Sequence, residues 1–122
     1  MSFSSVSPLE GMMYEVVSVD GSSLNKNIKL SFENVNIGVT GGCNGHGTEY
    51  TLDISNGKIS FGLFISTLIF CPDDQDGLVI GALRNSIRII ELGSPNKIAF
   101  IDEFNRKVMI VQKILQMDTF AG

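Results

Sequence analysis

Short runs of apolar residues alternate with polar residues along most of this chain. In one such run Ile28, Leu30 and Phe32 fall on one face of an extended backbone, and the residues between them are polar. This two-residue period is typical of antiparallel strands that bury one face and leave the other in water. The pattern predicts eight strands, at residues 12–19, 28–32, 35–39, 50–54, 58–61, 87–92, 97–101 and 107–114.

Residues that favour turns separate the predicted strands. Ser55-Asn56-Gly57 supplies the left-handed backbone that a tight hairpin needs before the strand at 58–61. Ser94-Pro95-Asn96 and residues 102–106 are turn sequences nearer the C-terminus. Successive strands joined in this way are expected to pair antiparallel.

One segment follows a helical pattern instead. Pro72 suits the first position of a helix, and acids after it complement the positive end of a helix dipole. A helix is therefore predicted from Pro72 to about Ser86, short because Gly77 and Gly81 weaken its propensity. The acids of its first turn are Asp73, Asp74 and Asp76, and its apolar stripe is Leu78, Val79, Ala82 and Leu83.

One helix among about eight strands predicts a mainly β (α+β) fold, because parallel βαβ units would need helices in regular alternation. The arrangement that buries most apolar area is a curved antiparallel sheet, or half-barrel, wrapped around the helix. We expect a mobile N-terminal arm at residues 1–11, a single domain at 12–115 and a C-terminal tail at 116–122.

Composition narrows the classes of function. The 122 residues are 43% hydrophobic, which is ample for a packed interior. The net charge of −4 gives no general attraction to nucleic acid or anionic lipid. No uninterrupted run of apolar residues is long enough to span a bilayer. The start of the chain has no pattern of a secretory signal, which favours a cytoplasmic location.

The two cysteines, Cys43 and Cys71, have a meaning that depends on compartment. They would form a disulfide in an oxidising space and stay thiols in the cytosol. Without a recognisable signal peptide, thiols are favoured.

The segment Gly41–Gly47 contains four glycines, a thiol and the single histidine of the chain. It matches neither phosphate-binding nor dinucleotide-binding glycine patterns, so it is interpreted as a turn or bulge that another segment approaches closely. Two alternatives stay open. Cys43 and His46 could form a nucleophilic pair, although no orienting group is evident. Zinc could be bound by Cys43, His46, Cys71 and Asp73, although the spacing is not diagnostic.

Residues 61–70 form the most apolar stretch, and such a stretch is usually core. A curved sheet that its helix does not fill would instead leave a cavity for an acyl chain. The residues predicted to line that cavity are Phe61, Phe64 and Phe70.

Three segments of the chain resemble the META domain family, which includes HslJ heat-shock lipoproteins of bacteria and META proteins of eukaryotic parasites. The resemblance spans about residues 13–112. Gly42-Cys43-Asn44 with Tyr50 is similar to the family's G-C-N…Y segment, and residues 14–21 occupy the place of its opening strand. Ser66-Thr67-Leu68-Ile69-Phe70-Cys71-Pro72 is similar to its S-T-x-M-A-C-P segment. Tyr14 replaces the opening Trp, Thr48 replaces a Gly, and Ile69-Phe70 replaces Met-Ala.

The resemblance implies an antiparallel half-barrel around a helix and no enzyme activity. We expect no cofactor and no bound metal. It implies that Cys43 and Cys71 lie close together, on neighbouring strands or strand ends that face the helix. We expect a monomeric protein that binds another protein, with a role in stress response, secretion or motility, or virulence. A binder of hydrophobic ligands is the alternative, and Cys43/His46 thiol chemistry is a third hypothesis.

Overall fold

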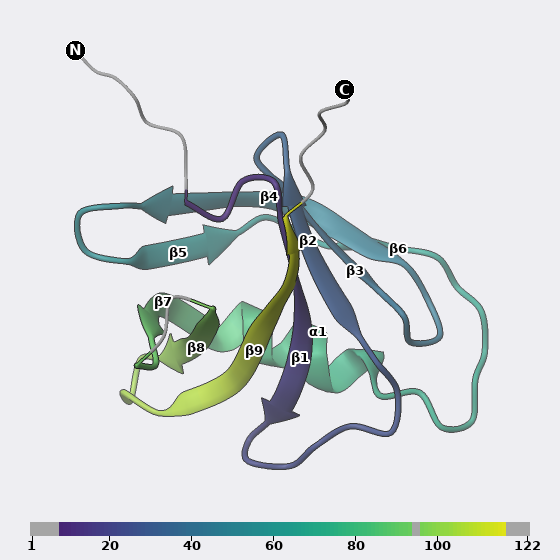
Figure 1. Ribbon diagram of the computed structural model, residues 1–122. Coiled ribbons are helices and arrows are strands. Elements are labelled where there is room, and N and C mark those ends of the chain that lie inside the picture. The colour runs from purple at the N-terminus through teal and green to yellow at the C-terminus, as the bar shows by residue number, and fades with distance from the viewer. Residues whose placement is uncertain (1–7, 94–95, 117–122) are drawn as a thin grey trace.

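The computed structural model describes residues 8–93 and 96–116 of the chain (Figure 1). Strands dominate, in agreement with the predicted mainly β class. Their bounds are β1 (Met12–Val19), β2 (Lys29–Glu33), β3 (Asn36–Thr40), β4 (His46–Asp53), β5 (Lys58–Phe61), β6 (Ile65–Ser66), β7 (Ser86–Glu91), β8 (Lys97–Asp102) and β9 (Lys107–Gln116). The described residues contain one helix, α1 (Asp76–Asn85).

Eight of the described strands close into a ring of antiparallel pairings. The order is β3-β2-β1-β9-β8-β7-β5-β4, and β3 also pairs with β4. The short strand β6 pairs with the start of β4, on the same edge of β4 as β5 and opposite β3. The weakest junction lies between β5 and β7, where Lys58 pairs with Arg88 and the Ile89 N–H donates to the Gly57 carbonyl oxygen at 2.9 Å. The predicted curved sheet around one helix is therefore confirmed.

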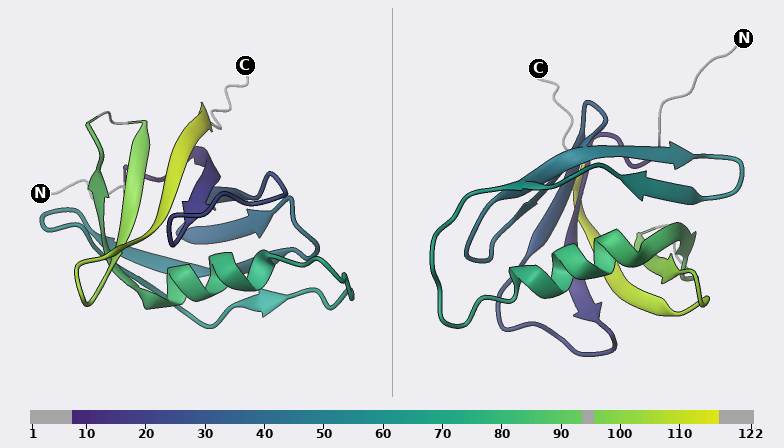
Figure 2. Two further views of the ribbon diagram at one scale, coloured as in Figure 1. Left: turned by 90° about the horizontal axis from the view of Figure 1, so that it is seen from below. Right: turned by 180° about the vertical axis from the view of Figure 1, so that it is seen from behind.

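The core lies between this curved sheet and α1, which crosses the strands in Figure 2 and packs against β9, β8, β1 and β5. Val79 and Leu83 of the helix are fully buried, as are Phe32 and Phe100 of the sheet. Full burial of each such side chain contributes about 1.5–3 kcal/mol. A helix weakened by two glycines is therefore held by its packing rather than by its own propensity.

The helix begins later than the sequence predicts, at Asp76 rather than Pro72. The Asp76 N–H donates to Oδ1 of Asp74 at 2.7 Å, and the side chain of Gln75 accepts the Asn25 N–H at 2.7 Å. These contacts hold residues 72–75 as a non-helical connection to the helix. Proline and acidic residues suit such a connection as well as they suit the first turn of a helix. The prediction that the helix starts at Pro72 was therefore wrong.

Strand β4 begins at His46, inside the glycine-rich segment, four residues before the predicted strand. Its early residues pair with β3, through Val39 and His46, and with β6, through His46 and Ser66. Strand β6 is absent from the prediction. Neither the start of β4 nor β6 shows a clear alternation of apolar and polar residues. Glycines and short polar residues occupy several of these pairing positions.

The expectation that residues 1–11 form a mobile arm is wrong for the last residues of that segment. Leu9 is buried in the core, and the carboxylate of Glu10 accepts the N–H groups of Asn34 and Val35 at 2.8 and 3.0 Å. The remainder of the arm at 1–7, most of the tail at 117–122 and Ser94-Pro95 of the predicted turn lie outside the described residues.

Candidate functional site

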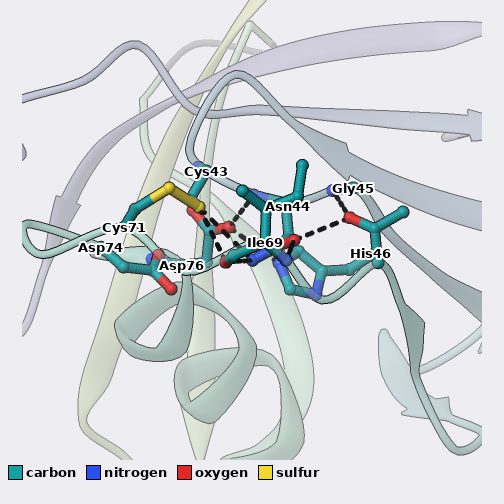
Figure 3. The surroundings of a disulfide bond; sticks show 9 residues. Cys43, Asn44, Gly45, His46, Ile69, Cys71, Asp74 and Asp76 are labelled. Carbon is teal, nitrogen blue, oxygen red and sulfur yellow. Dashed lines mark hydrogen bonds and ion pairs between the residues drawn. A yellow bond between two sulfur atoms is a disulfide. The ribbon is translucent and has the colours of Figure 1, made fainter.

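Cys43 and Cys71 are joined by a disulfide bond (Figure 3). Their Cα atoms are 6.1 Å apart, which is within the usual range for a disulfide. The predicted proximity is therefore confirmed, although both residues lie in connections rather than in strands. The favoured thiol state is wrong, because the fold brings together two residues that are 28 positions apart. A disulfide sulfur is neither a thiolate nucleophile nor a thiolate ligand, so this state excludes both the Cys43 nucleophile and the zinc alternative.

Asp76, the first residue of α1, is the centre of this region. Its side chain is 2% exposed and accepts three hydrogen bonds. The donors are the N–H groups of Cys43 and Asn44, at 3.1 and 2.7 Å, and Nε2 of His46, at 2.9 Å. A carboxylate at a helix N-terminus is also favoured by the helix dipole. Asp76 thus ties the connection between β3 and β4 to the start of the helix.

The environment of Asp76 stabilises its charged form. Burial on its own raises the pKa of this carboxyl. The hydrogen bonds from Asn44, His46 and Cys43 outweigh burial, so the pKa lies below its ordinary value. Asp76 is therefore an ionised structural anchor at neutral pH.

Gly42 lies against this carboxylate. A Cβ atom added at Gly42 would lie 1.8 Å from Oδ1 of Asp76, and one added at Gly41 would lie 2.2 Å from the Asn27 carbonyl oxygen. Gly41 also has a φ of +94°, a conformation that side chains other than glycine disfavour. The interpretation of this segment as a turn approached closely by other segments is confirmed.

Asn44 holds the segment that precedes Cys71. Its Oδ1 accepts the Ile69 N–H at 2.7 Å and the Thr67 hydroxyl at 2.8 Å, and its Nδ2 donates to the Ile69 carbonyl oxygen at 3.0 Å. The Gly45 N–H donates to the Thr67 hydroxyl at 3.1 Å. One amide side chain thus pairs with the backbone as a neighbouring strand would.

His46 connects this network to β6. Its Nδ1 lies 2.6 Å from the Ser66 hydroxyl, on the opposite side of the ring from Asp76. An ionised carboxylate can only accept, so Nε2 donates to Asp76, and a ring that carries this single proton accepts the Ser66 proton at Nδ1. A hydroxyl, an imidazole and a carboxylate in a line are also the elements of a nucleophilic triad. The sequence indicates no role for Asp76 beyond helix charge, because the partners of its side chain are 30 or more residues away.

The family-motif residues divide into two groups. The structure brings Gly42, Cys43, Asn44, Ser66, Thr67 and Cys71 together around the disulfide. Tyr50 instead lies in the core, where its ring centroid is 5.1 Å from that of Phe32 and its hydroxyl donates to Glu10 at 2.5 Å. Pro72 is exposed in the connection before the helix. Tyr50 is thus part of the packing that holds Glu10 and the start of the chain.

The structure does not gather the three predicted cavity residues into one cavity. Phe61 and Phe64 contact each other, with ring centroids 6.2 Å apart, and pack against the core. Phe61 lines a pocket that it shares with Arg84, whereas Phe70 lines a different pocket beside the disulfide.

Residues 63–70, which we name the apolar loop, are mostly on the surface. Leu68 and Phe70 are 94% and 88% exposed. The other exposed large apolar residues of the loop are Leu63, Ile65 and Ile69. The expectation that this stretch is core was therefore wrong, except for Phe61 and Phe64, which are partly buried against the core. The reason is that side chains of α1 and of the ring strands fill the interior.

A separate pocket of about 320 Å³ lies between β1, β4 and the β7–β8 hairpin. Its walls are largely apolar, with Lys113 and Glu91 among the lining residues. The apolar lining side chains include Leu9, Met12, Leu52, Ile89 and Ile98. This pocket includes none of the three predicted phenylalanines.

Comparison with known proteins identifies the fold. A family model described as META domain matches residues 7–108. A solved structure described as the NMR structure of the protein from Burkholderia xenovorans superposes with a TM-score of 0.67 at 18% identity, over 93% of this chain and 95% of that one. A second NMR structure gives a TM-score of 0.64 at 19% identity, over 93% and 98%. A search of curated proteins finds no significant match.

Two further observations concern the described part of the chain. Its helix is too short to cross a membrane. Residues 8–93 and 96–116 contain no group of three or more His, Cys, Asp or Glu side chains arranged to hold a metal ion.

Proposed function

The chain belongs to the META domain family, and from this premise we propose that it is a non-enzymatic module that binds another protein through the apolar loop. The observation that carries the proposal is the exposure of Leu63, Ile65 and Leu68 to Phe70. Clusters of exposed large apolar residues mark binding surfaces in soluble proteins. Burying one such side chain against a partner contributes about 1.5–3 kcal/mol.

The contacts at the base of the loop support a role in binding. The loop is joined to the domain by β6 at one end and by the Cys43–Cys71 disulfide at the other. Asn44 makes hydrogen bonds to it between these two points. A surface that is ordered before binding loses less conformational entropy when the partner arrives.

The proposal that the protein is not an enzyme draws support from the hydrogen bonds around Ser66. A nucleophilic serine needs N–H donors for the oxyanion that forms on its substrate. The N–H groups of Gly45 and Thr67, which flank the Ser66–His46 pair, donate to the Thr67 hydroxyl and the Gly45 carbonyl oxygen. Both donors are therefore already occupied within the fold.

The biological processes expected for the family belong to the same proposal. Stress response, secretion or motility, and virulence would each be served by a monomeric adaptor that recognises a partner. The adaptor would act through binding alone.

We expect the double substitution Leu68→Ser and Phe70→Ser to abolish partner binding while leaving the fold intact. Both side chains are mostly in water, so their loss costs little stability, whereas a partner would lose two apolar contacts. The measurement is photo-crosslinking in native extract, followed by quantification of the crosslinked species. A decrease of at least about a hundredfold in affinity is expected, because two lost side chains at roughly 1.5 kcal/mol each sum to about 3 kcal/mol.

The matched control is Phe104→Ser, which removes an exposed aromatic ring from the turn between β8 and β9. This variant should capture the partner as the wild type does. A stoichiometric partner that the double variant retains in full would contradict the proposal.

A second candidate function rests on the pocket between β1, β4 and β7. We propose that it could hold an apolar chain, with Lys113 near an anionic end group. A mostly apolar lining with few polar groups is typical of small-ligand sites. The 320 Å³ volume is at the small end for such sites, which favours a single short chain.

Titration with dodecanoic acid, followed by native mass spectrometry, tests this second candidate. Leu52→Trp would place a larger side chain in the pocket and is expected to weaken binding about tenfold, while Phe104→Ser should leave it unchanged. The absence of a bound mass at saturating dodecanoic acid would contradict this function and leave the protein-binding proposal untouched.

A further inference from the structure

We propose that the Cys43–Cys71 disulfide is a reversible redox switch of partner binding. A small monothiol of the glutathione class opens the bond from a pocket beside it, and opening frees the Phe70 end of the apolar loop. The inference rests on the proposed function and adds the regulation of that same surface. It follows from the access to the bond, from the contacts of Cys43, and from the few contacts that hold residues 70–74.

The disulfide is accessible from solvent. Cys43 and Cys71 are both half-buried, and both line a pocket of about 280 Å³. Thiol–disulfide exchange needs a thiolate to reach one of the two sulfur atoms, and accessible disulfides are the labile and regulatory ones. The pocket wall carries both signs of charge, with Lys26 against Asp73 and Asp74, so it neither requires nor excludes an anionic thiol.

The surroundings of Cys43 accommodate both redox states (Figure 3). Its N–H donates to Oδ1 of Asp76 at 3.1 Å, a bond that does not involve the sulfur. Its Sγ lies 3.2 Å from the carbonyl oxygen of Ile69, which can accept the proton of a reduced thiol. Nδ2 of Asn44 lies 3.5 Å from the same sulfur and can donate to it while it is a thiolate. The sulfur of Cys43 is therefore stabilised as a leaving group, and Cys71 is the residue that the incoming thiolate attacks.

The exchange has two steps in which atoms and electrons balance. A glutathione thiolate attacks Sγ of Cys71 and forms a mixed disulfide there; the bond to Cys43 breaks, and the Cys43 sulfur keeps the electron pair and takes up a proton. The thiolate of a second glutathione attacks the glutathione sulfur of the mixed disulfide and releases Cys71 as a thiolate, which also takes up a proton. Two glutathione molecules are oxidised to one glutathione disulfide, and the protein disulfide is reduced to two thiols. Excess glutathione disulfide reverses both steps.

Residues 70–74 depend on the disulfide for their position. Their described hydrogen bonds are local, because the Asp74 N–H donates to the Cys71 carbonyl oxygen at 3.3 Å and Oδ1 of Asp74 accepts the Asp76 N–H at 2.7 Å. Within the described chain, no hydrogen bond joins this segment to a residue outside 70–76. The disulfide is therefore the bond that fixes the segment to the connection between β3 and β4.

The residues on either side of this segment keep their hydrogen bonds after reduction. Asn44 holds Ile69 on one side, and the side chain of Gln75 accepts the Asn25 N–H on the other. Opening the disulfide thus loosens Phe70 and leaves the start of the apolar loop attached. A partner would then have to immobilise Phe70 on binding, which costs conformational entropy. We expect about a fivefold weaker affinity for the reduced form, which corresponds to about 1 kcal/mol.

The first measurement is the redox equilibrium of the whole chain in mixtures of reduced and oxidised glutathione. Thiols are trapped by alkylation and counted by mass spectrometry. We expect the two forms to interconvert and to reach the same ratio from either starting form, with backbone amide spectra that show the native fold in both. A bond that stays closed in excess reduced glutathione, or a reduced chain that unfolds, would overturn the inference.

NMR relaxation then locates the change. Backbone order parameters of residues 70–74 should fall from about 0.85, the value of rigid backbone, to below about 0.6 on reduction. The decrease should be smaller at Ile69, which Asn44 still holds. Equal order parameters of residues 70–74 in the two forms would show that the bond controls nothing in the loop and would overturn the inference.

Photo-crosslinking in native extract measures the effect on binding. The reduced wild type should give about fivefold less crosslinked species than the oxidised wild type. The matched control is the double variant Cys43→Ser with Cys71→Ser, which has no bond to open and should give the same low yield with and without glutathione. This control separates the state of the disulfide from any effect of the thiol on the partner. Equal yields from oxidised and reduced wild type would overturn the inference.

Two outcomes separate the inference from the proposed function. If capture depends on Leu68 and Phe70 but is equal for the two redox forms, the inference fails and the proposed function stands. If residues 70–74 loosen on reduction but capture does not depend on Leu68 and Phe70, the proposed function fails, and the role of the disulfide in binding fails with it.

Discussion

Replacing Cys43 and Cys71 together by serine is expected to lower the free energy of unfolding by about 3–4 kcal/mol. The disulfide links residues 28 positions apart, and closing a loop of that size removes much conformational freedom from the unfolded chain. Urea denaturation of the oxidised wild type and the double variant, followed by fluorescence or circular dichroism, measures the difference.

The wild type after reduction provides the matched control, because it loses the bond and keeps both side-chain positions. Its midpoint should fall close to that of the double variant. Amide exchange in residues 67–71 should also accelerate, since Asn44 and β6 alone would then hold the apolar loop. An unchanged midpoint in both samples would show that the disulfide does not stabilise the fold.

The bond also bears on the compartment in which the protein works. Structural disulfides persist in oxidising compartments and are rare in the cytosol. The cytoplasmic location expected from the sequence stays a prediction, and it would require the thiol form for most of the protein's life. Trapping the cysteines by rapid alkylation in cells would establish which form is present.

Replacing Asp76 by alanine is expected to lower the free energy of unfolding by about 3–5 kcal/mol at neutral pH. The change leaves the N–H groups of Cys43 and Asn44 without their acceptor, and an unsatisfied buried donor costs about 1–3 kcal/mol. It also removes the partner of His46 Nε2. Asp76→Asn keeps the size and one acceptor oxygen, so it should cost roughly half as much. Urea denaturation at pH 7 checks both values.

The effect of Asp76 should depend on pH in a direction set by its pKa. Its pKa is lower in the folded chain than the ordinary value of about 4, so the folded state favours the ionised carboxylate. The corresponding stability is fully present above about pH 5 and is lost as pH falls through the lowered pKa. The difference in stability between the wild type and Asp76→Asn should therefore shrink between about pH 5 and pH 2. A difference that stays constant over this range would contradict the assignment of Asp76 as an ionised anchor.

The fold could be predicted from local pattern to a considerable extent. Strands β1, β5, β8 and β9 lie within two residues of the predicted bounds, because alternating apolar and polar residues record which face of a strand is buried. The turn after β4 also follows the prediction, with Gly57 at a φ of +75°. The helix ends where expected, since Asn85 is followed directly by the strand that starts at Ser86.

The candidate site could be predicted only in part. The glycine-rich segment could be recognised as a point of close approach, but the approaching group, Asp76, could not be identified. Its three donors come from residues 30–33 positions earlier, and no local pattern encodes that distance. The exposure of the apolar loop could not be predicted either, because an apolar run has the same sequence pattern whether it is buried or exposed.

The sequence by itself determined the class of fold, the places where most strands lie and the single helix, because these depend on neighbours within a few residues. Tertiary structure alone decided that Cys43 and Cys71 form a disulfide, that Asp76 holds the glycine-rich turn, and that Leu68 and Phe70 face water, whereas the closeness of the two cysteines was already implied by the family resemblance. The physical reason is that burial and pairing require a partner surface at a matching place. Only the closing of the sheet around α1 determines which surfaces find one.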